Sequence, residues 1–335
     1  MTSASRRVFL TGLALAILGS VLFSGKGVVI KLSYRYGVDP TTLIALRMAF
    51  AAPFFVLVYA WVARRSPPLA RGDHLRLIGL GLTGYYASSF LSFLGLQYVS
   101  AGLERLILYL NPTLVLLMSA AFLGKRIERL DWMALGVSYC GIVLAVWHQL
   151  RFDGGQVGYG SALVFGSALL YAMYLVMSGE LMRRVGAIRL TAYAMLVSTV
   201  AVLVQFAVLH PLAALNQPEP VLWLSFINGF ACTVLPVFAV MMAVDRIGAG
   251  NAALSGMVGP VSTIFVAWVF LGETVSGWQL AGTALVLTGV YFLSLKGLRR
   301  RPMPAPVSVA DSVANPVANS VANSVAKTAT KEIQR

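Results

Sequence analysis

Charged residues are scarce in this chain, and those present are unbalanced. Lysine, arginine, aspartate and glutamate make up 11% of its 335 residues, whereas soluble domains carry about 25%. Acidic residues are the rarer kind, at 12 against 26 basic ones. With 58% hydrophobic residues and a mean hydropathy of +0.79, the composition excludes an ordinary soluble domain and predicts a protein that crosses a bilayer several times.

Cysteine and histidine are nearly absent as well. Cys140 and Cys232 both lie in apolar runs, so we expect neither a disulfide framework nor a metal site. The three histidines fall at loops or at the ends of apolar runs. A membrane-embedded enzyme needs clustered carboxylates, metal ligands or a nucleophile beside a base. Because the apolar runs contain no such cluster, we expect no catalytic residue, no cofactor and no enzymatic activity.

Long apolar runs dominate the sequence. A transmembrane helix needs about 20 predominantly apolar residues, and ten runs meet this requirement. We predict spans at residues 8–30, 41–63, 76–97, 102–123, 130–148, 157–178, 189–210, 221–243, 250–271 and 277–295.

The basic residues are distributed unevenly between the loops. With the N-terminus in the cytoplasm, 17 lysines and arginines fall in cytoplasmic segments. Four fall on the opposite side: Lys31, Arg35, Arg105 and Arg151. Because basic loops are retained in the cytoplasm, the sequence predicts a multi-pass protein of the bacterial inner membrane with both termini cytoplasmic. These loops account for most of the net charge of +14, so we expect no binding to nucleic acid.

An internal repeat organises the chain. Four residues of the fourth predicted span recur 148 positions later in the ninth: Gly102, Pro112, Leu123 and Gly124. Each copy contains five predicted helices, and an odd number inverts the second copy across the membrane. We therefore predict an all-α membrane protein built from two inverted five-helix repeats, at 8–146 and 157–295. The SVAN-like repeats within 302–335 contain no large apolar residue and predict a disordered cytoplasmic tail.

Both copies resemble the EamA domain, the five-helix repeat of the drug/metabolite transporter superfamily. The resemblance rests on the S/G-A-G…P…L-G-(E/K) pattern of the fourth helix and on K-x8-P-x6-R from Lys31 through Pro40 to Arg47. Lys125 stands where the family usually has glutamate, which Glu273 keeps in the second copy. The resemblance implies a ten-helix transporter that moves small metabolites, often outward. We expect a small-molecule substrate and the lipid bilayer as partners, with the chain acting as a monomer or homodimer.

Lys26 interrupts the first apolar run and is the first candidate for a substrate site. Gly12, Gly19 and Lys26 are spaced by seven residues and share one face of the predicted helix, opposite a stripe of branched aliphatic residues. Small residues mark the faces on which membrane helices pack closely. This spacing predicts that Lys26 points into the bundle, and the alternative is that it snorkels to the outer interface.

Arg47 and Glu104 are predicted to lie at a similar depth to Lys26. Two cations against one acid leave a positive surplus, which suits an amino acid or another substrate with a carboxylate. Glu104 is then a gate or a proton-coupling group, unless it only neutralises Lys26 or Arg47 in a salt bridge. Met173 and Met195 are the expected repeat counterparts of the two cations, so the second copy lacks these charges.

Two proline steps occupy matching positions in the fourth and ninth spans, Asn111-Pro112 and Gly259-Pro260. Proline bends a membrane helix and frees carbonyl groups for a substrate or for water, although it also produces simple packing kinks. Further candidates for the substrate cavity are polar or aromatic residues within the spans: Asn251, Ser255, Tyr85, Tyr109, Tyr171 and Tyr174.

The aromatic candidates leave the substrate class open. Stacked tyrosines suit an aromatic or cationic compound as well as an amino acid. The sequence therefore predicts an exporter of carboxylate-bearing metabolites working by alternating access. A drug or cation exporter of the same fold, a lipid flippase and a channel are the alternatives.

Overall fold

The computed structural model describes residues 3–124, 127–153 and 156–299, and these residues form helices joined by loops. Eight segments are long and apolar enough to cross a membrane, and Val258–Leu271 is a shorter apolar helix. The eight are Arg7–Tyr34, Pro40–Ala63, Arg71–Gly95, Ala101–Leu123, Arg129–Trp147, Gln156–Gly179, Ala187–Leu209 and Glu219–Val240. The predicted all-helical membrane protein is thus confirmed. The predicted tail at 302–335 lies outside the described residues, as does Lys125.

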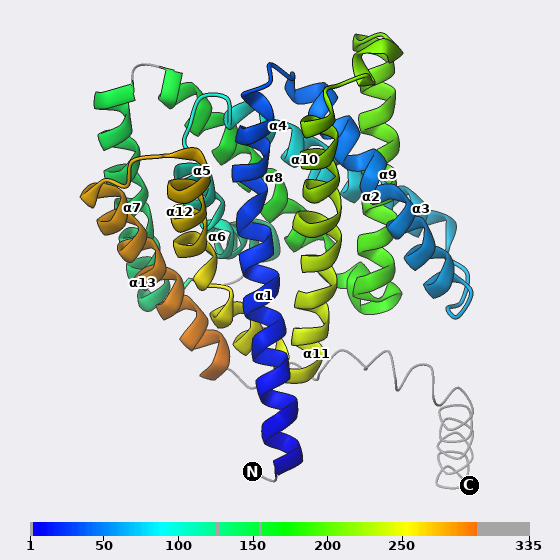
Figure 1. Ribbon diagram of the computed structural model, residues 1–335. Coiled ribbons are helices and arrows are strands. Elements are labelled where there is room, and N and C mark those ends of the chain that lie inside the picture. The colour runs from blue at the N-terminus through cyan, green and yellow to red at the C-terminus, as the bar shows by residue number, and fades with distance from the viewer. Residues whose placement is uncertain (1–2, 125–126, 154–155, 300–335) are drawn as a thin grey trace, which may run out of the picture. The chain divides into compact units, whose positions relative to one another are not determined.

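Figure 1 shows the helices in chain order. The first half contains α1 (Ser3–Tyr34), α2 (Pro40–Ala63), α3 (Arg71–Gly81), η1 (Leu82–Ala87), α4 (Ser88–Gly95), α5 (Ala101–Leu108), α6 (Asn111–Leu123) and α7 (Arg129–Asp153). The second half contains α8 (Gln156–Val185), α9 (Ala187–Leu209), η2 (Leu212–Leu215), α10 (Glu219–Gly229), η3 (Phe230–Val234), α11 (Leu235–Ser255), α12 (Val258–Leu271) and α13 (Gly277–Arg299).

The internal repeat has a structural counterpart in three local features. The π-helical segments η1 and η3 begin 148 residues apart, at Leu82 and Phe230. A glycine in the left-handed conformation follows the last residue of both α6 and α12. These are Gly124 (φ 64°) and Gly272 (φ 68°), which are also 148 residues apart. A third common feature is the break in a helix before each proline step. The same backbone irregularities therefore recur in both halves.

The prediction that the ninth span begins at residue 250 is wrong. Helix α11 continues to Ser255, and the chain breaks at Gly256 and Met257 before α12 begins at Val258. Pro260 explains the position of the break, because proline lacks an N–H and its ring disfavours helix in the turn before it. Within the first turn of a new helix the same residue is well tolerated.

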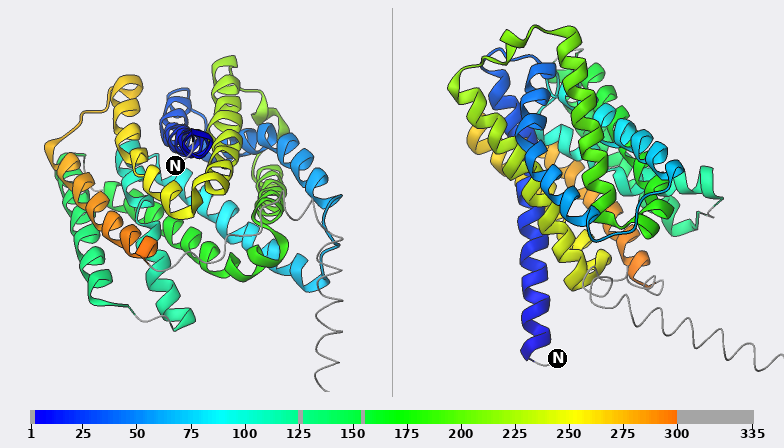
Figure 2. Two further views of the ribbon diagram at one scale, coloured as in Figure 1. Left: turned by 90° about the horizontal axis from the view of Figure 1, so that it is seen from below. Right: turned by 90° about the vertical axis from the view of Figure 1, so that its right-hand side faces the viewer.

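The two halves pack mainly against each other. Helix α1 lies between α10–α11 and α12 (Figure 2), whereas α8 packs against α4, α5 and α6. Helix α2 pairs with α9, and α7 pairs with α13. The first helix of each half, α1 or α8, therefore contacts the third and fourth predicted spans of the other half.

The second helices of the two halves run in opposite directions. Asp39 caps the start of α2 by accepting from the amides of Thr41 and Thr42, and it lies 3.4 Å from His210 at the end of α9. At the other end, Arg189 near the start of α9 donates to the carbonyl of Pro67, beyond α2. The start of each helix therefore meets the end of the other.

Candidate functional site

Lys26 lies in a chain of polar contacts that joins α1, α4 and α5. Its Nζ donates to Ser92 Oγ at 3.3 Å, and Ser92 Oγ donates to Glu104 Oε1 at 2.7 Å. The Lys26 Nζ and Glu104 Oε1 atoms are 3.9 Å apart. The Glu104 side chain is 3% exposed and that of Lys26 is 18% exposed. Lys26 thus points into the protein and forms an ion pair with Glu104.

Glycine brings α1 close enough for this pair. A Cβ atom on Gly27 would lie 3.4 Å from Glu104 Oε2. On the same helix, side chains at Gly12 and Gly19 would collide with Ile247 and Val240 of α11. The small residues of α1 therefore mark its packing faces, as their spacing predicts.

Arg47 is buried in α2 beside the same cluster, with 3% of its surface exposed. Its Nη2 lies 3.4 Å from Ser89 Oγ, and its guanidinium lies 5.1 Å from the centre of the Phe93 ring. The Lys26 amine lies 5.8 Å from the same ring. Among the described residues, no carboxylate lies within ion-pair distance of Arg47, and its Nε has no hydrogen-bond partner. Met195, its expected counterpart, is a buried apolar residue.

Arg105, which the sequence analysis counts among the basic residues of the outer side, also belongs to this cluster. It lies in α5 directly after Glu104, and a Cβ on Gly259 would be 2.9 Å from its Nη2. Both Arg47 and Arg105 are close enough to Lys26 to repel its ammonium group, whereas Glu104 attracts it. The sequence contained a signal for this placement, since Arg105 falls inside the predicted span 102–123. Ser92 and Phe93 had no such signal, because uncharged residues are common in membrane helices.

The proline steps differ in their surroundings. In the second half, Pro260 and Gly259 are buried, and α1 satisfies the carbonyls of the break. Ser20 donates to the Gly256 carbonyl at 2.9 Å, and Ser24 donates to the Gly259 carbonyl at 2.8 Å. These carbonyls therefore hold α12 against α1.

The hydrogen-bonding groups at the proline step of the first half, Asn111-Pro112, are less completely satisfied. Pro112 is exposed, and Asn111 is partly buried with an Oδ1 atom that has no partner among the described groups. The residues around this step pack against α8, where Leu110 and Leu114 contact Ala168 and Ala172. The two proline steps thus face the first helices of opposite halves.

Three of the four predicted tyrosines form one aromatic cluster. Tyr85 lies in η1, and Tyr171 and Tyr174 lie in α8. Ring centres are 5.1 Å apart for Tyr85 and Tyr174, and 5.6 Å apart for Tyr171 and Tyr174. Tyr109 stands apart from them at the end of α5, close enough to interact with Arg105. The tyrosines therefore do not line one common surface.

The remaining candidates lie near the end of α11. Ser255 is the last residue of that helix and is partly buried. Asn251 belongs to the same helix, but its side chain lies outside the described part of the structure.

A second group of contacts fastens the end of α1 to its neighbours. Lys31 Nζ lies 3.0 Å from Glu273 Oε1 and donates to the Val99 carbonyl at 2.9 Å. Glu273 also accepts from the amide of Ala101 at the start of α5, at 3.1 Å. Arg35 donates to the Leu271 carbonyl at the end of α12. Glu273 therefore connects the end of α1 to the start of α5.

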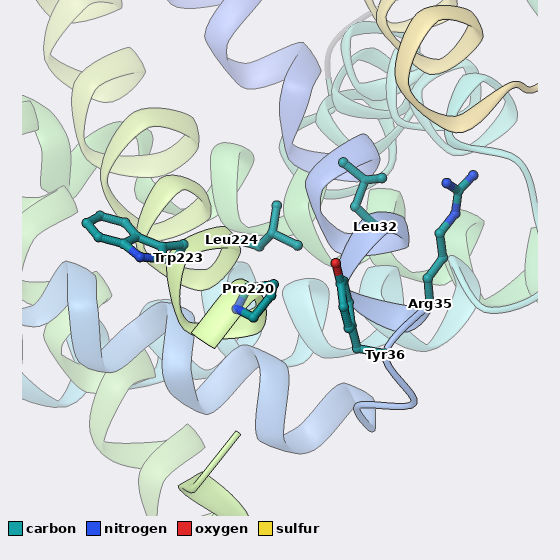
Figure 3. Close-up of a pocket in the computed structure, with 6 residues that line it drawn as sticks. All are labelled: Leu32, Arg35, Tyr36, Pro220, Trp223 and Leu224. Carbon is teal, nitrogen blue, oxygen red and sulfur yellow. The ribbon is translucent and has the colours of Figure 1, made fainter. Parts of the chain in front are cut away.

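A surface cleft lies beside this end of α1 (Figure 3), and none of its lining residues belongs to the charged cluster. Its volume is about 450 Å³, and it is bounded by the last turn of α1 and the first turns of α10. The lining residues are Leu32, Arg35, Tyr36, Pro220, Trp223 and Leu224. Since Arg35 donates to Leu271, the cleft is mainly an aromatic and aliphatic surface.

The sequence is similar to known transporters along most of its length. The model of the EamA-like transporter family matches residues 10–147 and 158–295. The chain is 32% identical over 299 residues to the uncharacterized transporter YcbK of Bacillus subtilis (strain 168), covering 85% of this chain and 94% of that protein. It is 27% identical over 270 residues to a probable terminal-alkyne amino-acid exporter of Streptantibioticus cattleyicolor, covering 79% and 87%.

A solved crystal structure has a similar fold. It aligns with a TM-score of 0.60 at 19% identity, covering 85% of this chain and 98% of that one. At this identity the likeness concerns the arrangement of the helices alone.

Proposed function

The chain belongs to the EamA-like transporter family, and on that premise we propose that it exports small carboxylate-bearing metabolites, amino acids or related compounds, by alternating access. Members of this family are transporters, and the chain is a multi-pass membrane protein. The proposal therefore assigns no enzymatic step to it. The similarity to an amino-acid exporter supports the substrate class and the direction.

The observation that carries this proposal is the burial of Arg47 without a carboxylate partner among the described residues. An ionised group inside a membrane protein is costly unless it is paired. Arg47 is 3% exposed and has a hydroxyl group and an aromatic ring as its neighbours. A substrate carboxylate supplies the missing negative charge, and a guanidinium binds a carboxylate in a two-pronged geometry.

Glu104 has a different role in this proposal. It neutralises Lys26 in the closed cluster, so a substrate carboxylate that approaches Lys26 competes with Glu104 for the ammonium group. Separation of the pair then opens the cluster, and protonation of the freed carboxylate offers a way to couple transport to protons. Both roles follow from one ion pair of 3.9 Å.

We assign ten crossings to the protein; α13 is the tenth, and α12, a shorter apolar helix of 14 residues, lies in the ninth. The repeats 8–146 and 157–295 are inverted across the bacterial inner membrane, and both termini are cytoplasmic. The opposite directions of α2 and α9 support this inversion, and the basic loops support the orientation. The end of α1, with Lys31 and Glu273, then faces outward, and 302–335 is a cytoplasmic tail. The protein acts as a monomer or homodimer.

Transport by purified protein in liposomes tests the proposal. Labelled leucine, phenylalanine, glutamate and succinate are supplied to vesicles preloaded with the unlabelled compound, and exchange is followed as the concentration rises. We expect saturable exchange of at least one of them. Arg47→Gln should raise its KM by about tenfold or more, the loss of one charge-assisted hydrogen bond.

Arg189→Gln is the matched control. Arg189 is also buried with an unpartnered Nε, but it donates to Pro67 away from the cluster. A similar loss of exchange in both variants would attribute the effect to a buried arginine in general. Exchange of an organic cation in place of all four compounds would favour the drug or cation exporter, and non-saturable flux would favour a channel.

A further inference from the structure

The surroundings of Arg105 indicate a second anion-binding position. A Cβ atom built on Gly259 would lie 2.9 Å from Arg105 Nη2, 2.9 Å from Ser20 Oγ and 3.3 Å from Ser24 Oγ, so the guanidinium and the two hydroxyl groups lie around this glycine. The Arg105 Nε is buried and has no hydrogen-bond partner among the described groups. The glycine thus makes room for a cation beside two hydroxyl groups.

The carbonyls at the helix break do not depend on Arg105. An arginine near a helix break can serve the carbonyl groups that the break leaves free. Here the carbonyls of Gly256 and Gly259 already accept from Ser20 and Ser24. The guanidinium is therefore not needed to satisfy these two carbonyls.

The charges in the cluster are unequal in number. Lys26 and Glu104 form an ion pair. Arg47 lies over Phe93 beside this pair, and Arg105 follows Glu104 in α5 and lies near Gly259. Among the described residues, Glu104 is the one acid in the cluster, and neither arginine has a carboxylate within ion-pair distance. The cluster therefore carries two positive charges in excess of its single acid.

We propose that Arg47 and Arg105 are two anion subsites of one binding site, and that the substrate is a small compound with two acidic groups, a dicarboxylate or an amino dicarboxylate. This inference rests on the proposed function and narrows its substrate class. One carboxylate binds at Arg47 and the other at Arg105. The ammonium group of an amino dicarboxylate faces Glu104, whose charge it complements. A substrate with one carboxylate fills half of the site.

Exchange of succinate, glutamate and leucine by the reconstituted full-length protein tests this inference. We expect succinate and glutamate to have KM values about tenfold or more below that of leucine, since they gain one additional charge-assisted contact. Arg105→Gln should raise KM for the two dicarboxylates by about tenfold and change that of leucine by less than about twofold. Arg105→Lys, which keeps the charge, should restore most of the difference. Arg189→Gln should leave all three values unchanged.

The outcomes separate the inference from the function on which it rests. A wild-type preference for leucine, or an equal loss for all three compounds in Arg105→Gln, overturns the two-subsite inference and leaves carboxylate export standing. No exchange of these three compounds or of phenylalanine overturns both. If Arg105→Gln is too unstable to reconstitute, thermal unfolding in detergent replaces transport. Succinate should then raise the Tm of the wild type and of Arg105→Lys more than leucine does, because a ligand stabilises the form it binds. Equal shifts would contradict the inference.

Discussion

Neutralising Glu104 alone should destabilise the protein more than neutralising Glu104 and Lys26 together. The two charges are 3.9 Å apart and largely buried. At an effective dielectric constant of about 20 they attract each other by about 4 kcal/mol. Glu104→Gln removes this attraction and leaves Lys26 beside Arg47 and Arg105, which repel it. We expect the free energy of unfolding to fall by about 3–5 kcal/mol, the usual consequence of leaving one buried charge unpaired.

The double variant should recover most of this loss. Lys26→Met introduces the residue that the second repeat carries at Met173, so the side chain remains long and apolar. With Glu104→Gln in the same protein, no charge of the pair is left uncompensated. Replacing a buried ion pair by neutral groups of similar size is often nearly neutral. We therefore expect a coupling energy of about 2–4 kcal/mol between the two positions.

Equilibrium unfolding in mixed micelles of a mild detergent and SDS, followed by tryptophan fluorescence, measures these differences. Ser89→Ala is the control, because Ser89 contacts Arg47 rather than the ion pair. If the double variant lost as much stability as the sum of the two single variants, the pair would contribute nothing and the argument from its geometry would be refuted. The transport activity of a stable double variant then reports the functional role of the pair separately.

Three further changes test the packing and the ends of the helices. A Cβ on Gly84 would overlap the ring of Tyr174, so Gly84→Ala should lower the free energy of unfolding by about 1–3 kcal/mol. A Cβ on Gly79 would meet open space, so Gly79→Ala is the control and should be nearly neutral when both variants are compared by thermal unfolding. Glu273→Gln should lower the Tm by weakening its contacts with the end of α1 and the start of α5; an unchanged Tm at low salt would contradict these contacts. Partial burial raises the pKa of Asp39, but hydrogen bonds from the start of α2 outweigh it and hold that pKa below its ordinary value of 3.8. The stabilisation by the charged Asp39 carboxylate is therefore complete above pH 3.8 and lost as the pH falls below this value. The stability deficit of Asp39→Asn should accordingly be smaller at about pH 3 than at about pH 6, and a deficit that stays constant would argue against stabilisation of the charged carboxylate.

The membrane helices were predictable because hydropathy is a local property. The runs that became α2 and α9 end within one or two residues of their predicted limits, at caps visible in the sequence such as Asp39-Pro40. The extension of α11 to Ser255 was not predictable in this way. A run of small and apolar residues can continue as a helix until a helix-breaking residue follows. Here that residue is Pro260, so α11 ends further along the chain than the limit of the eighth apolar run indicated.

The charged cluster was predictable in part. The spacing of glycines identified the face on which α1 packs, and the positions of Lys26, Arg47 and Glu104 in apolar runs singled them out. Helical periodicity assigns a residue to a face but does not say which helix covers that face. Ser92 bridges the ion pair only because α4 lies beside both α1 and α5. One neighbour of Arg105, Gly259, likewise comes from the opposite half of the chain, more than 150 residues away.

The glycine at position 259 also constrains how this duplicated protein can change. The first repeat carries Asn111 at the equivalent place, 148 residues earlier. A Cβ at 259 would lie 2.9 Å from both Arg105 Nη2 and Ser20 Oγ, so a side chain there requires the Arg105 guanidinium and the Ser20 hydroxyl to move. Substitutions at 259 and at 105 are therefore expected to be coupled, and a library that varies one of these positions should also vary the other.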